Sequence, residues 1–423
     1  MLSISKDASL NYLSRVIRIE NVRKHPNADR LQMVTVDGAN IVVGLDVKVG
    51  DIMIYCPTES QIDEGFVYIN NLFEEKTRNI DNTKKGYIGK MCRVRAVRLR
   101  GEVSRAILLP LEYFQNWLDL STSDIEKIKS CEGEEFDTIN GKRFSKKYTV
   151  ADKNVQSNRN KAKKVNNKVS EHFRFHIDTP HLARNIGRFD GEDAYIQITH
   201  KLHGTSGIAA YLKKHKDISW WKRAVYSFLG ITPLEYDYIA SSRKVIREDE
   251  KGNGFYGEKD VWVWALEQLK PFLWKGMSLY FEIVGYVPDG SKMIQKGYDY
   301  GCKEGEAKIY IYRITSTGED GNVLEWTSQQ VSAWCEDMGL NAVPEFYYGR
   351  IKDFTQGADI YTKIKNWRYM EGNDPLCENS VPFEGFVVRI ETNKDIEVYK
   401  VKSEAFYTHE TKMLDDEYFG VEN

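Results

Sequence analysis

The sequence lacks an excess of basic residues, closely spaced cysteines and long apolar runs. Lys and Arg number 60 against 62 Asp and Glu, a formal charge of −2, so any surface that binds a polyanion must be local. The six cysteines show neither a C-x-x-C pair nor Cys/His zinc spacing, which favours reduced thiols and an intracellular protein, cytoplasmic or nuclear. No apolar signal core opens the sequence and no 18-residue apolar run follows. We therefore expect no secretion, no membrane span and no membrane partner.

The chain does contain enough apolar residues for two or three domains, with 423 residues of which 41% are hydrophobic and 12% aromatic. Its first third consists of short β-type runs separated by turn residues. These runs cover residues 16–19, 31–36, 41–43, 52–55, 91–100 and 105–110. About five strands in roughly 100 residues, with little helix between them, are typical of a small closed barrel of the OB type. We assign residues 1–140 to such a barrel with a flanking helix.

Four arginines, with no acidic residue between them, lie in the segment 93–100. They are Arg93, Arg95, Arg98 and Arg100. Charged and apolar residues alternate in this segment, and we expect the four arginines to share one strand face and the apolar residues the other. That face is a candidate surface for contacting nucleic-acid phosphates, with a solvated strand face as the alternative.

The composition changes between residues 141 and 171, where Lys, Arg, Asn and Ser dominate and Asp152 is the one acidic residue before Glu171. Low hydrophobicity with concentrated positive charge cannot build a core, so this stretch is predicted to be a mobile basic linker. It separates the barrel from a second domain, residues 172–423, in which strands alternate with longer helical stretches in an α+β pattern. The linker could also follow a nucleic-acid backbone.

A lysine near the middle of the chain, Lys201, follows the apolar run 194–198 and opens a turn of small residues around Gly204. Such a turn leaves little bulk to obstruct a ligand, so it suits a nucleophilic amine. A solvated strand end is the alternative.

Six short segments in a fixed order give this lysine its context. They are Lys201-Leu202-His203-Gly204-Thr205, Ser242-Arg243, Phe281-Glu282-Ile283, Tyr310-Ile311-Tyr312, Glu384-Gly385-Phe386-Val387 and Lys400-Val401-Lys402. Together they resemble the motifs of the ATP-dependent RNA ligases, a branch of the covalent nucleotidyltransferases. Residues 93–110 also resemble the N-terminal OB domain of one family of these ligases. The resemblance therefore implies an OB-fold domain joined to a nucleotidyltransferase (adenylation) domain.

The resemblance implies a role for each charged residue of the motifs. Lys201 would be the nucleophile that attacks the α-phosphate of ATP. Lys400 and Lys402, one strand period apart, would lower the pKa of that amine and bind the α-phosphate. Glu282 would accept hydrogen bonds from the ribose hydroxyls, and Glu384 would hold Mg²⁺ or Mn²⁺ through water.

Four further residues complete the implied cofactor site. Tyr312 would stack on the adenine, with Tyr310 as a competitor. Arg243 would contact the ribose or the phosphates of the nucleic-acid end. Arg184, in a segment that resembles the one before the nucleophile strand, is a candidate for contacting the ATP phosphates or the adenylate pocket. His203 stands where DNA ligases carry Asp, and we expect it to orient the loop at Gly204 rather than act as a base.

The function implied is joining of a 3′-hydroxyl end to a 5′-phosphate end of RNA through lysyl-AMP, as in RNA repair, at nicks in RNA or RNA/DNA duplexes and by a monomer. Two alternatives remain open: a capping-type RNA guanylyltransferase, and a non-catalytic RNA-binding protein with a vestigial transferase domain. The resemblance does not cover residues 213–236, where cations alternate with aromatics. We expect an amphipathic helix packed on the domain there, with contact to single-stranded RNA as the alternative.

Overall fold

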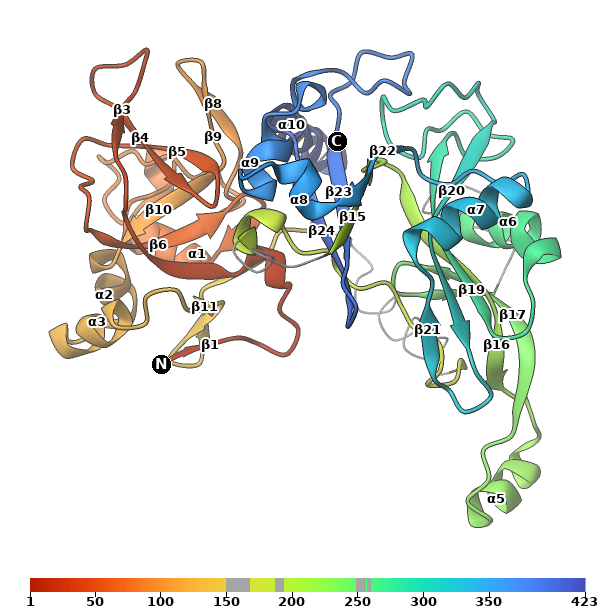
Figure 1. Ribbon diagram of the computed structural model, residues 1–423. Coiled ribbons are helices and arrows are strands. Elements are labelled where there is room, and N and C mark those ends of the chain that lie inside the picture. The colour runs from red at the N-terminus through yellow and green to blue at the C-terminus, as the bar shows by residue number, and fades with distance from the viewer. Residues whose placement is uncertain (150–167, 187–193, 249–255, 257–259, 423) are drawn as a thin grey trace. The chain divides into compact units, whose positions relative to one another are not determined.

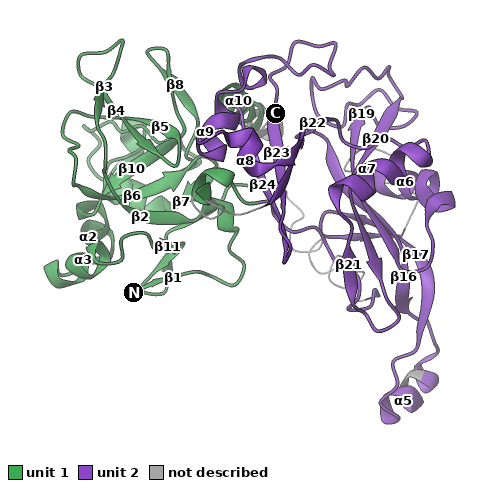
Figure 2. Ribbon diagram, viewed as in Figure 1, with its two compact units in different colours: residues 1–151, 180–186, 404–423 green, residues 152–179, 187–403 purple. Residues whose placement is uncertain are grey.

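The computed structural model describes residues 1–149, 168–186, 194–248, 256 and 260–422. Most of the linker expected at 141–171 lies outside this part. The chain forms two compact units. The first comprises Met1–Ala151, Pro180–Ile186 and Glu404–Asn423, and the second comprises Asp152–Thr179 and Gly187–Ser403 (Figure 2). The expectation of an α+β protein is confirmed.

The first unit is built from short antiparallel strands. Its largest sheet has the order β10 (Ala106–Pro110), β6 (Ile52–Pro57), β2 (Ser14–Arg18), β11 (Glu135–Phe136). A second sheet contains β3 (Arg23–Lys24), β4 (Gln32–Val36) and β5 (Ala39–Val43). Asp37 and Gly38 join β4 to β5 with φ of 48° and 67°, as a tight hairpin of this hand requires. The remaining strands pair in small groups: β1 (Leu2–Ser3) with β12 (Thr138–Ile139) and β13 (Lys142–Arg143), β7 (Ser60–Ile62) with β14 (Ser145–Lys147), and β8 (Val97–Leu99) with β9 (Glu102–Ser104). The strands therefore form several separate sheets, and closure into one barrel is not shown.

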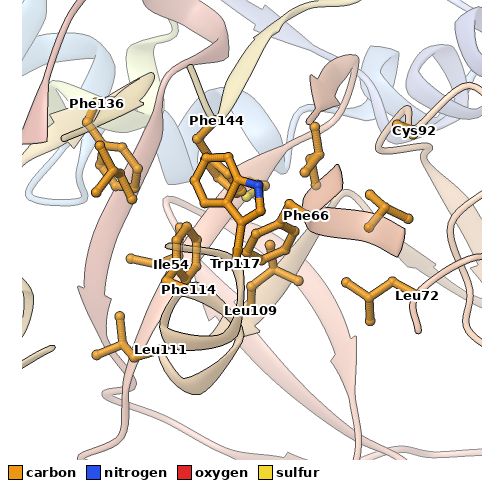
Figure 3. Packing of buried hydrophobic residues seen from close by; sticks show 14 of the residues in the cluster. Ile54, Phe66, Leu72, Cys92, Leu109, Leu111, Phe114, Trp117, Phe136 and Phe144 are labelled. Carbon is orange, nitrogen blue, oxygen red and sulfur yellow. The ribbon is translucent and has the colours of Figure 1, made fainter. Parts of the chain in front are cut away.

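An aromatic cluster holds three short helices of this unit against its strands. The helices are α1 (Glu64–Ile69), α2 (Glu112–Leu118) and α3 (Thr122–Lys129). Phe66 of α1 and Phe114 of α2 have ring centroids 4.8 Å apart, and both rings lie within 5.0 Å of Phe144 (Figure 3). Because Phe144 lies between β13 and β14, the prediction that the linker begins at residue 141 is wrong: residues 142–147 belong to the folded unit.

The C-terminal helix α10 (Glu404–Glu422) also belongs to the first unit, although the sequence assigned it to the second domain. The link is the buried Arg93, which pairs with Glu59 at 3.0 Å and with Asp415 of α10 at 2.5 Å. Thr411 of α10 donates its hydroxyl to Glu59 at 3.0 Å. Contacts between residues so far apart in sequence leave no local pattern, which is why the boundary was misplaced.

The four arginines of the segment 93–100 do not form one charged face. The side chain of Arg93 is only 3% exposed, so the structure removes it from any phosphate-contacting surface. Arg95 pairs with Glu74, and Arg98 donates to the carbonyl of Gly101. Only Val97–Leu99 is strand, and in a regular strand Arg93 and Arg95 would face opposite to Arg98 and Arg100. Arg95, Arg98 and Arg100 remain candidates.

The second unit contains two antiparallel sheets. The larger has the order β18 (Ile246–Arg247), β17 (Leu234–Ser242), β16 (Thr205–His215), β19 (Met277–Gly285), β20 (Ala307–Thr317), β21 (Val323–Glu325). The smaller has the order β22 (Glu345–Arg350), β15 (Tyr195–His200), β23 (Gly385–Glu391), β24 (Ile396–Lys402). Helices α6 (Val261–Leu269) and α7 (Ser328–Asp337) pack on the larger sheet (Figure 1), with Trp262, Phe281, Ile311 and Trp334 in the shared core. Helices α8 (Ile351–Thr355) and α9 (Ile360–Lys365) follow β22.

Helix α5 (Trp220–Phe228) departs from expectation. The helix forms, but it lies at the tip of the long hairpin β16–β17, and the side chain of Phe228 is 91% exposed (Figure 1). The prediction that it packs on the domain is therefore wrong. Among the described residues, no helix combines the length and apolar character that a membrane crossing requires.

We predict that Arg93→Met destabilises the first unit by about 3–5 kcal/mol, because it breaks the ion pairs with Glu59 and Asp415 and leaves the buried Glu59 carboxyl without its cation. The matched control is Arg95→Met, whose partner Glu74 is 44% exposed and whose loss should cost about 1 kcal/mol or less. Denaturant unfolding of both variants measures the difference. Equal losses would contradict the assignment of Arg93 as the anchor of α10.

Candidate functional site

Lys201 lies where the chain crosses from one sheet of the second unit to the other. β15 ends at His200 and β16 begins at Thr205, so Lys201 stands in the connection between the two sheets. Its backbone N–H donates to the carbonyl of Gly385 at 2.9 Å, which extends the β15–β23 pairing by one residue. The main chain of Lys201 is thus fixed while its side chain is 24% exposed, so a ligand can reach the amine.

A buried carboxylate, Glu384, meets three cations or potential cations of the site. Its Oε1 lies 2.7 Å from Lys201 Nζ and 3.9 Å from Lys402 Nζ, and its Oε2 lies 3.4 Å from His203 Nδ1. Burial alone would raise the pKa of Glu384, but the Lys201 ammonium, His203 and Lys402 together hold it well below its ordinary value. The structure therefore brings together four of the residues that the sequence singled out.

Gly204 lets the nucleophile loop lie directly against β19. A Cβ at this position would come within 2.2 Å of the carbonyl oxygen of Ile283 and 2.9 Å of Glu282 Cγ. Its carbonyl accepts a hydrogen bond from Gln295 Nε2 at 2.8 Å. Only a residue without a side chain fits here, which explains physically why glycine follows His203.

His203 is held both by its backbone and by its ring. Its backbone N–H donates to the hydroxyl of Tyr300 at 2.6 Å, and its ring packs edge-on against Tyr298 with centroids 4.7 Å apart. Together with the contact to Glu384, these interactions hold the loop beside the carboxylate.

The residues that hold the loop form a bracket, Tyr298, Asp299 and Tyr300, which sequence reasoning missed. Tyr298 donates its hydroxyl to the carbonyl of Pro382 at 2.8 Å. Asp299 accepts the backbone N–H groups of Glu378 and Asn379 at 2.9 and 2.8 Å. The bracket therefore ties the segment that leads to Glu384 to the loop that carries Lys201.

A pair of buried side chains, His200 and Asp374, was also missed by sequence reasoning. It joins the segment that carries Lys201 to the segment that leads to Glu384. His200 Nε2 lies 2.8 Å from Asp374 Oδ2, and both side chains are fully buried. A signal existed in the sequence, because His200 directly precedes the nucleophile, but its partner is 174 residues away.

Glu282 lies on the other wall of the site, in β19 opposite Ser206 of β16. Its carboxylate accepts the Ser206 hydroxyl at 2.7 Å. Burial raises the pKa of Glu282 to about 7, with Lys201 and Ser206 opposing this rise and Glu384 adding to it. Glu282 is therefore the site carboxylate that gains or loses its charge near neutral pH.

Both tyrosines proposed to stack on adenine lie on β20. Tyr310 is the direct cross-strand neighbour of Glu282, whereas Tyr312 stands at an irregularity in the β19–β20 pairing. Burial and the Glu282 carboxylate raise the pKa of Tyr312, and its ring centroid lies 6.0 Å from that of His176. Both tyrosines therefore lie beside Glu282, and the choice of Tyr312 over Tyr310 stays a prediction.

Arg243 follows β17 and pairs with Asp178 at the surface. Nearby, His176 is a further residue that the sequence did not reveal. Burial lowers its pKa to about 4, and the positive charges of Arg243, Arg313 and Lys201 add to the effect. Its ring is therefore neutral at physiological pH, beside a positively charged part of the site.

The two remaining predicted cofactor residues are Lys400 and Arg184. Lys400 is half-buried on β24 opposite Val387, two residues before Lys402 and on the same strand face. Arg184 groups with the first unit, where it pairs with Glu135 at 3.0 Å and lies 3.8 Å from Asp37. The role of Arg184 in a phosphate site stays a prediction.

A metal ion would not be caged by protein side chains alone here. Among the described residues, no group of three or more His, Cys, Asp or Glu could hold one. Glu282 and Glu384 supply two oxygen-donor carboxylates, both mostly engaged with Lys201, Lys402 and Ser206. This donor set fits a hard cation bound largely through water.

Comparison with known proteins agrees with this geometry. Residues 13–111 match an OB-fold domain model, and residues 194–402 match the RNA ligase family model. The second match spans the two sheets and all residues that meet at Lys201. No curated protein matches the chain.

Solved structures share the whole fold. A lysine-to-methionine variant of the Naegleria gruberi RNA ligase with AMP and Mn is 15% identical, with a TM-score of 0.56 over 93% of this chain and 98% of that one. A lysine-to-alanine variant of the same ligase with ATP and Mn is 15% identical, with a TM-score of 0.54 over 96% and 99%. The ligase with PPi is also 15% identical, with a TM-score of 0.53 over 94% and 98%.

The fold and the site thus define a nucleotidyltransferase-type domain preceded by an OB-fold domain. The chain belongs to the RNA ligase family, and the expectation of an enzyme of the RNA ligase class is confirmed.

We predict that Gly204→Ala destabilises the second unit by about 1–3 kcal/mol, because the new Cβ forces the loop away from β19. The control is Gly290→Ala, where the nearest atom to a new Cβ is the Val287 carbonyl oxygen at 3.5 Å. Thermal unfolding of both variants measures the difference. A neutral Gly204→Ala variant would show that the loop does not depend on this close approach.

Proposed function

We propose that the protein is an ATP-dependent RNA ligase that joins a 3′-hydroxyl end to a 5′-phosphate end at nicks in RNA or RNA/DNA duplexes. The observation that carries the proposal is the contact of Lys201 with Glu384 and, through it, Lys402, within the domain that matches the RNA ligase family. Solved structures of the Naegleria ligase with ATP, AMP and Mn support the choice of nucleotide and metal.

In the first step Lys201 Nζ attacks the α-phosphorus of ATP. The N–P bond forms, the bond to the pyrophosphate oxygen breaks, and pyrophosphate leaves. The amine must lose its proton and leave its 2.7 Å contact with Glu384 before it attacks. Lys402, 3.9 Å from the same carboxylate oxygen, can keep Glu384 paired when Lys201 moves to the phosphate. In the free enzyme the nucleophile is therefore held by Glu384.

Charge on the α-phosphate is offset by the groups around it. Lys400 and Lys402 supply positive charge from β24. A divalent metal bound through water near Glu384 would add a Lewis acid at this phosphate. The two lysines also stabilise the charge that develops in the transition state.

The nucleoside is held by the opposite wall. Glu282 accepts hydrogen bonds from the ribose hydroxyls, a role that Ser206 supports by fixing one carboxylate oxygen at 2.7 Å. Tyr312 stacks on the adenine, and His203 and Gly204 keep the loop close to the nucleotide. Arg184 and Arg243 bind phosphates, Arg243 after release from Asp178.

Two further transfers complete the reaction. A 5′-phosphate oxygen of the RNA end attacks the phosphorus of lysyl-AMP, and Lys201 leaves as the amine. The 3′-hydroxyl then attacks the 5′-phosphorus, forms the phosphodiester bond and releases AMP. In each step the protein mainly places in-line groups and neutralises charge. Arg95, Arg98 and Arg100 of the OB-fold unit contact the duplex backbone.

We predict that incubation with ATP and Mg²⁺ adds the mass of one adenylyl group to the protein, and that Lys201→Ala abolishes the addition because the acceptor amine is gone. Lys216→Ala, which removes an exposed lysine at the start of the hairpin tip, is the matched control and should be adenylylated as the parent is. Intact-mass spectrometry reads both. Labelling by GTP in place of ATP would favour a capping-type guanylyltransferase, and no labelling at all would favour a vestigial domain.

We predict sealing of nicked duplexes in which RNA supplies the 3′-hydroxyl end, with loss of activity when that strand is DNA. Gel assays on every RNA and DNA combination of strands test this directly. A protein that adenylylates Lys201 but seals only single-stranded ends would overturn the nick assignment while leaving the lysyl-AMP chemistry intact.

A further inference from the structure

An isolated apolar surface stands at the tip of the β16–β17 hairpin, and it has no part in the site at Lys201. Several of the large hydrophobic side chains that are exposed in the described part of the chain lie within residues 220–234. These are Trp220, Trp221, Val225, Phe228, Leu229, Ile231 and Leu234. Trp220 is 82% exposed and Phe228 is 91% exposed. Clustered exposure of this kind marks an interaction surface, whereas single exposed apolar residues do not.

The surface is one face of an amphipathic helix. At 3.6 residues per turn, the apolar residues of α5 and its C-cap fall in one half of the helix circumference: Trp220, Trp221, Ala224, Val225, Phe228 and Leu229. Lys222, Tyr226 and Ser227 fall in the other half. The segment 218–234 contains Lys222 and Arg223 but no Asp or Glu, and Asp217 directly precedes it, so the tip has two cationic residues against one acidic residue.

The lysines that precede the helix, at and just after the end of β16, already form ion pairs. Lys213 pairs with Glu319, Lys214 lies 3.3 Å from Asp237, and Lys216 lies 3.4 Å from Glu235. The unbalanced positive charge of the hairpin is therefore confined to the helix that carries the apolar face.

The area of the apolar face indicates which kind of partner can bind it. A nine-residue helix is about 13.5 Å long and about 10–12 Å wide, so its apolar half presents on the order of 250 Å². A stable protein interface buries about 800 Å² per partner, so neither a protein nor a second copy of this chain could bind on this face alone. RNA bases could stack on Trp220, Trp221 and Phe228, but the rest of the exposed surface, Val225, Leu229 and Ile231, is aliphatic and offers no ring for stacking. A lipid surface does not require the polar rim that surrounds the apolar centre of a protein interface. It accommodates aliphatic, aromatic and cationic side chains together.

We propose that α5 is a docking helix for an anionic lipid surface. Trp220, Trp221 and Phe228 enter the headgroup region, and Lys222 stays among the anionic headgroups. The position at the hairpin tip, away from the two sheets of the second unit, lets the helix reach a bilayer without displacing the site (Figure 1). No membrane partner was expected from the sequence, because a nine-residue amphipathic helix leaves no long apolar run.

The test is flotation of the full chain with vesicles of phosphatidylcholine alone and of phosphatidylcholine mixed with phosphatidylserine. We expect binding to the anionic vesicles and at least about fivefold less to the neutral ones. The double variant W220E/F228E should lower binding by about tenfold or more, because its carboxylates resist entry into the headgroup region. Leu324→Glu, at an apolar side chain of β21 that is 68% exposed, is the matched control and should bind as the parent does.

A third variant separates charge from apolar contact. Lys222→Glu should weaken binding to anionic vesicles and leave the small binding to neutral vesicles unchanged. Lysine adenylylation should be the same in all variants, which shows that each is folded. Failure of the parent to float with anionic vesicles would overturn the proposal. Flotation that W220E/F228E leaves intact would also overturn it, as would dimerisation or RNA binding that this variant abolishes in a protein that does not float.

Discussion

The ion pair between Lys201 and the buried carboxylate of Glu384 is the interaction on which the site depends. A carboxylate at 3% exposure is costly unless cations surround it, and here Lys201, Lys402 and His203 do so. The pair also joins the two sheets of the second unit, because Lys201 stands between β15 and β16 while Glu384 directly precedes β23. The same contacts therefore pair the buried carboxylate with cations and position the nucleophile.

The chemistry requires a neutral amine, so Lys201 must leave its contact with Glu384 before it attacks. We take this as the reason for a second cation on the same carboxylate. Lys402 can keep Glu384 satisfied while Lys201 turns to the phosphate, so release of the nucleophile does not leave a buried charge alone. Glu282, whose pKa lies at about 7, is a second carboxylate with a different environment and a different role. The two walls of the site are thus electrostatically distinct.

Around this centre, buried polar groups hold two segments of the chain together. The bracket of Tyr298, Asp299 and Tyr300, and the pair of His200 with Asp374, connect the nucleophile loop to the segment before Glu384. Neither set needs to touch a substrate. Their role is to hold the reacting groups at fixed distances, on which in-line transfer depends. The exposed α5 has no such constraint from the site, and it can serve a separate interaction.

The sequence by itself determined the order of the motifs, the α+β class and the OB-fold domain before the ligase domain. It also singled out Lys201, Glu282, Glu384 and Lys402 as candidate site residues. These rest on short local patterns, which a sequence displays directly. Only the tertiary structure decided that Arg93 is buried, that α10 belongs to the first unit, that residues 142–147 are strands and that α5 is exposed. Each of these depends on contacts between residues far apart in the chain, or on whether an amphipathic face finds a partner. Local periodicity gives a helix or a strand its two faces, but the packing of the whole chain decides which face is covered.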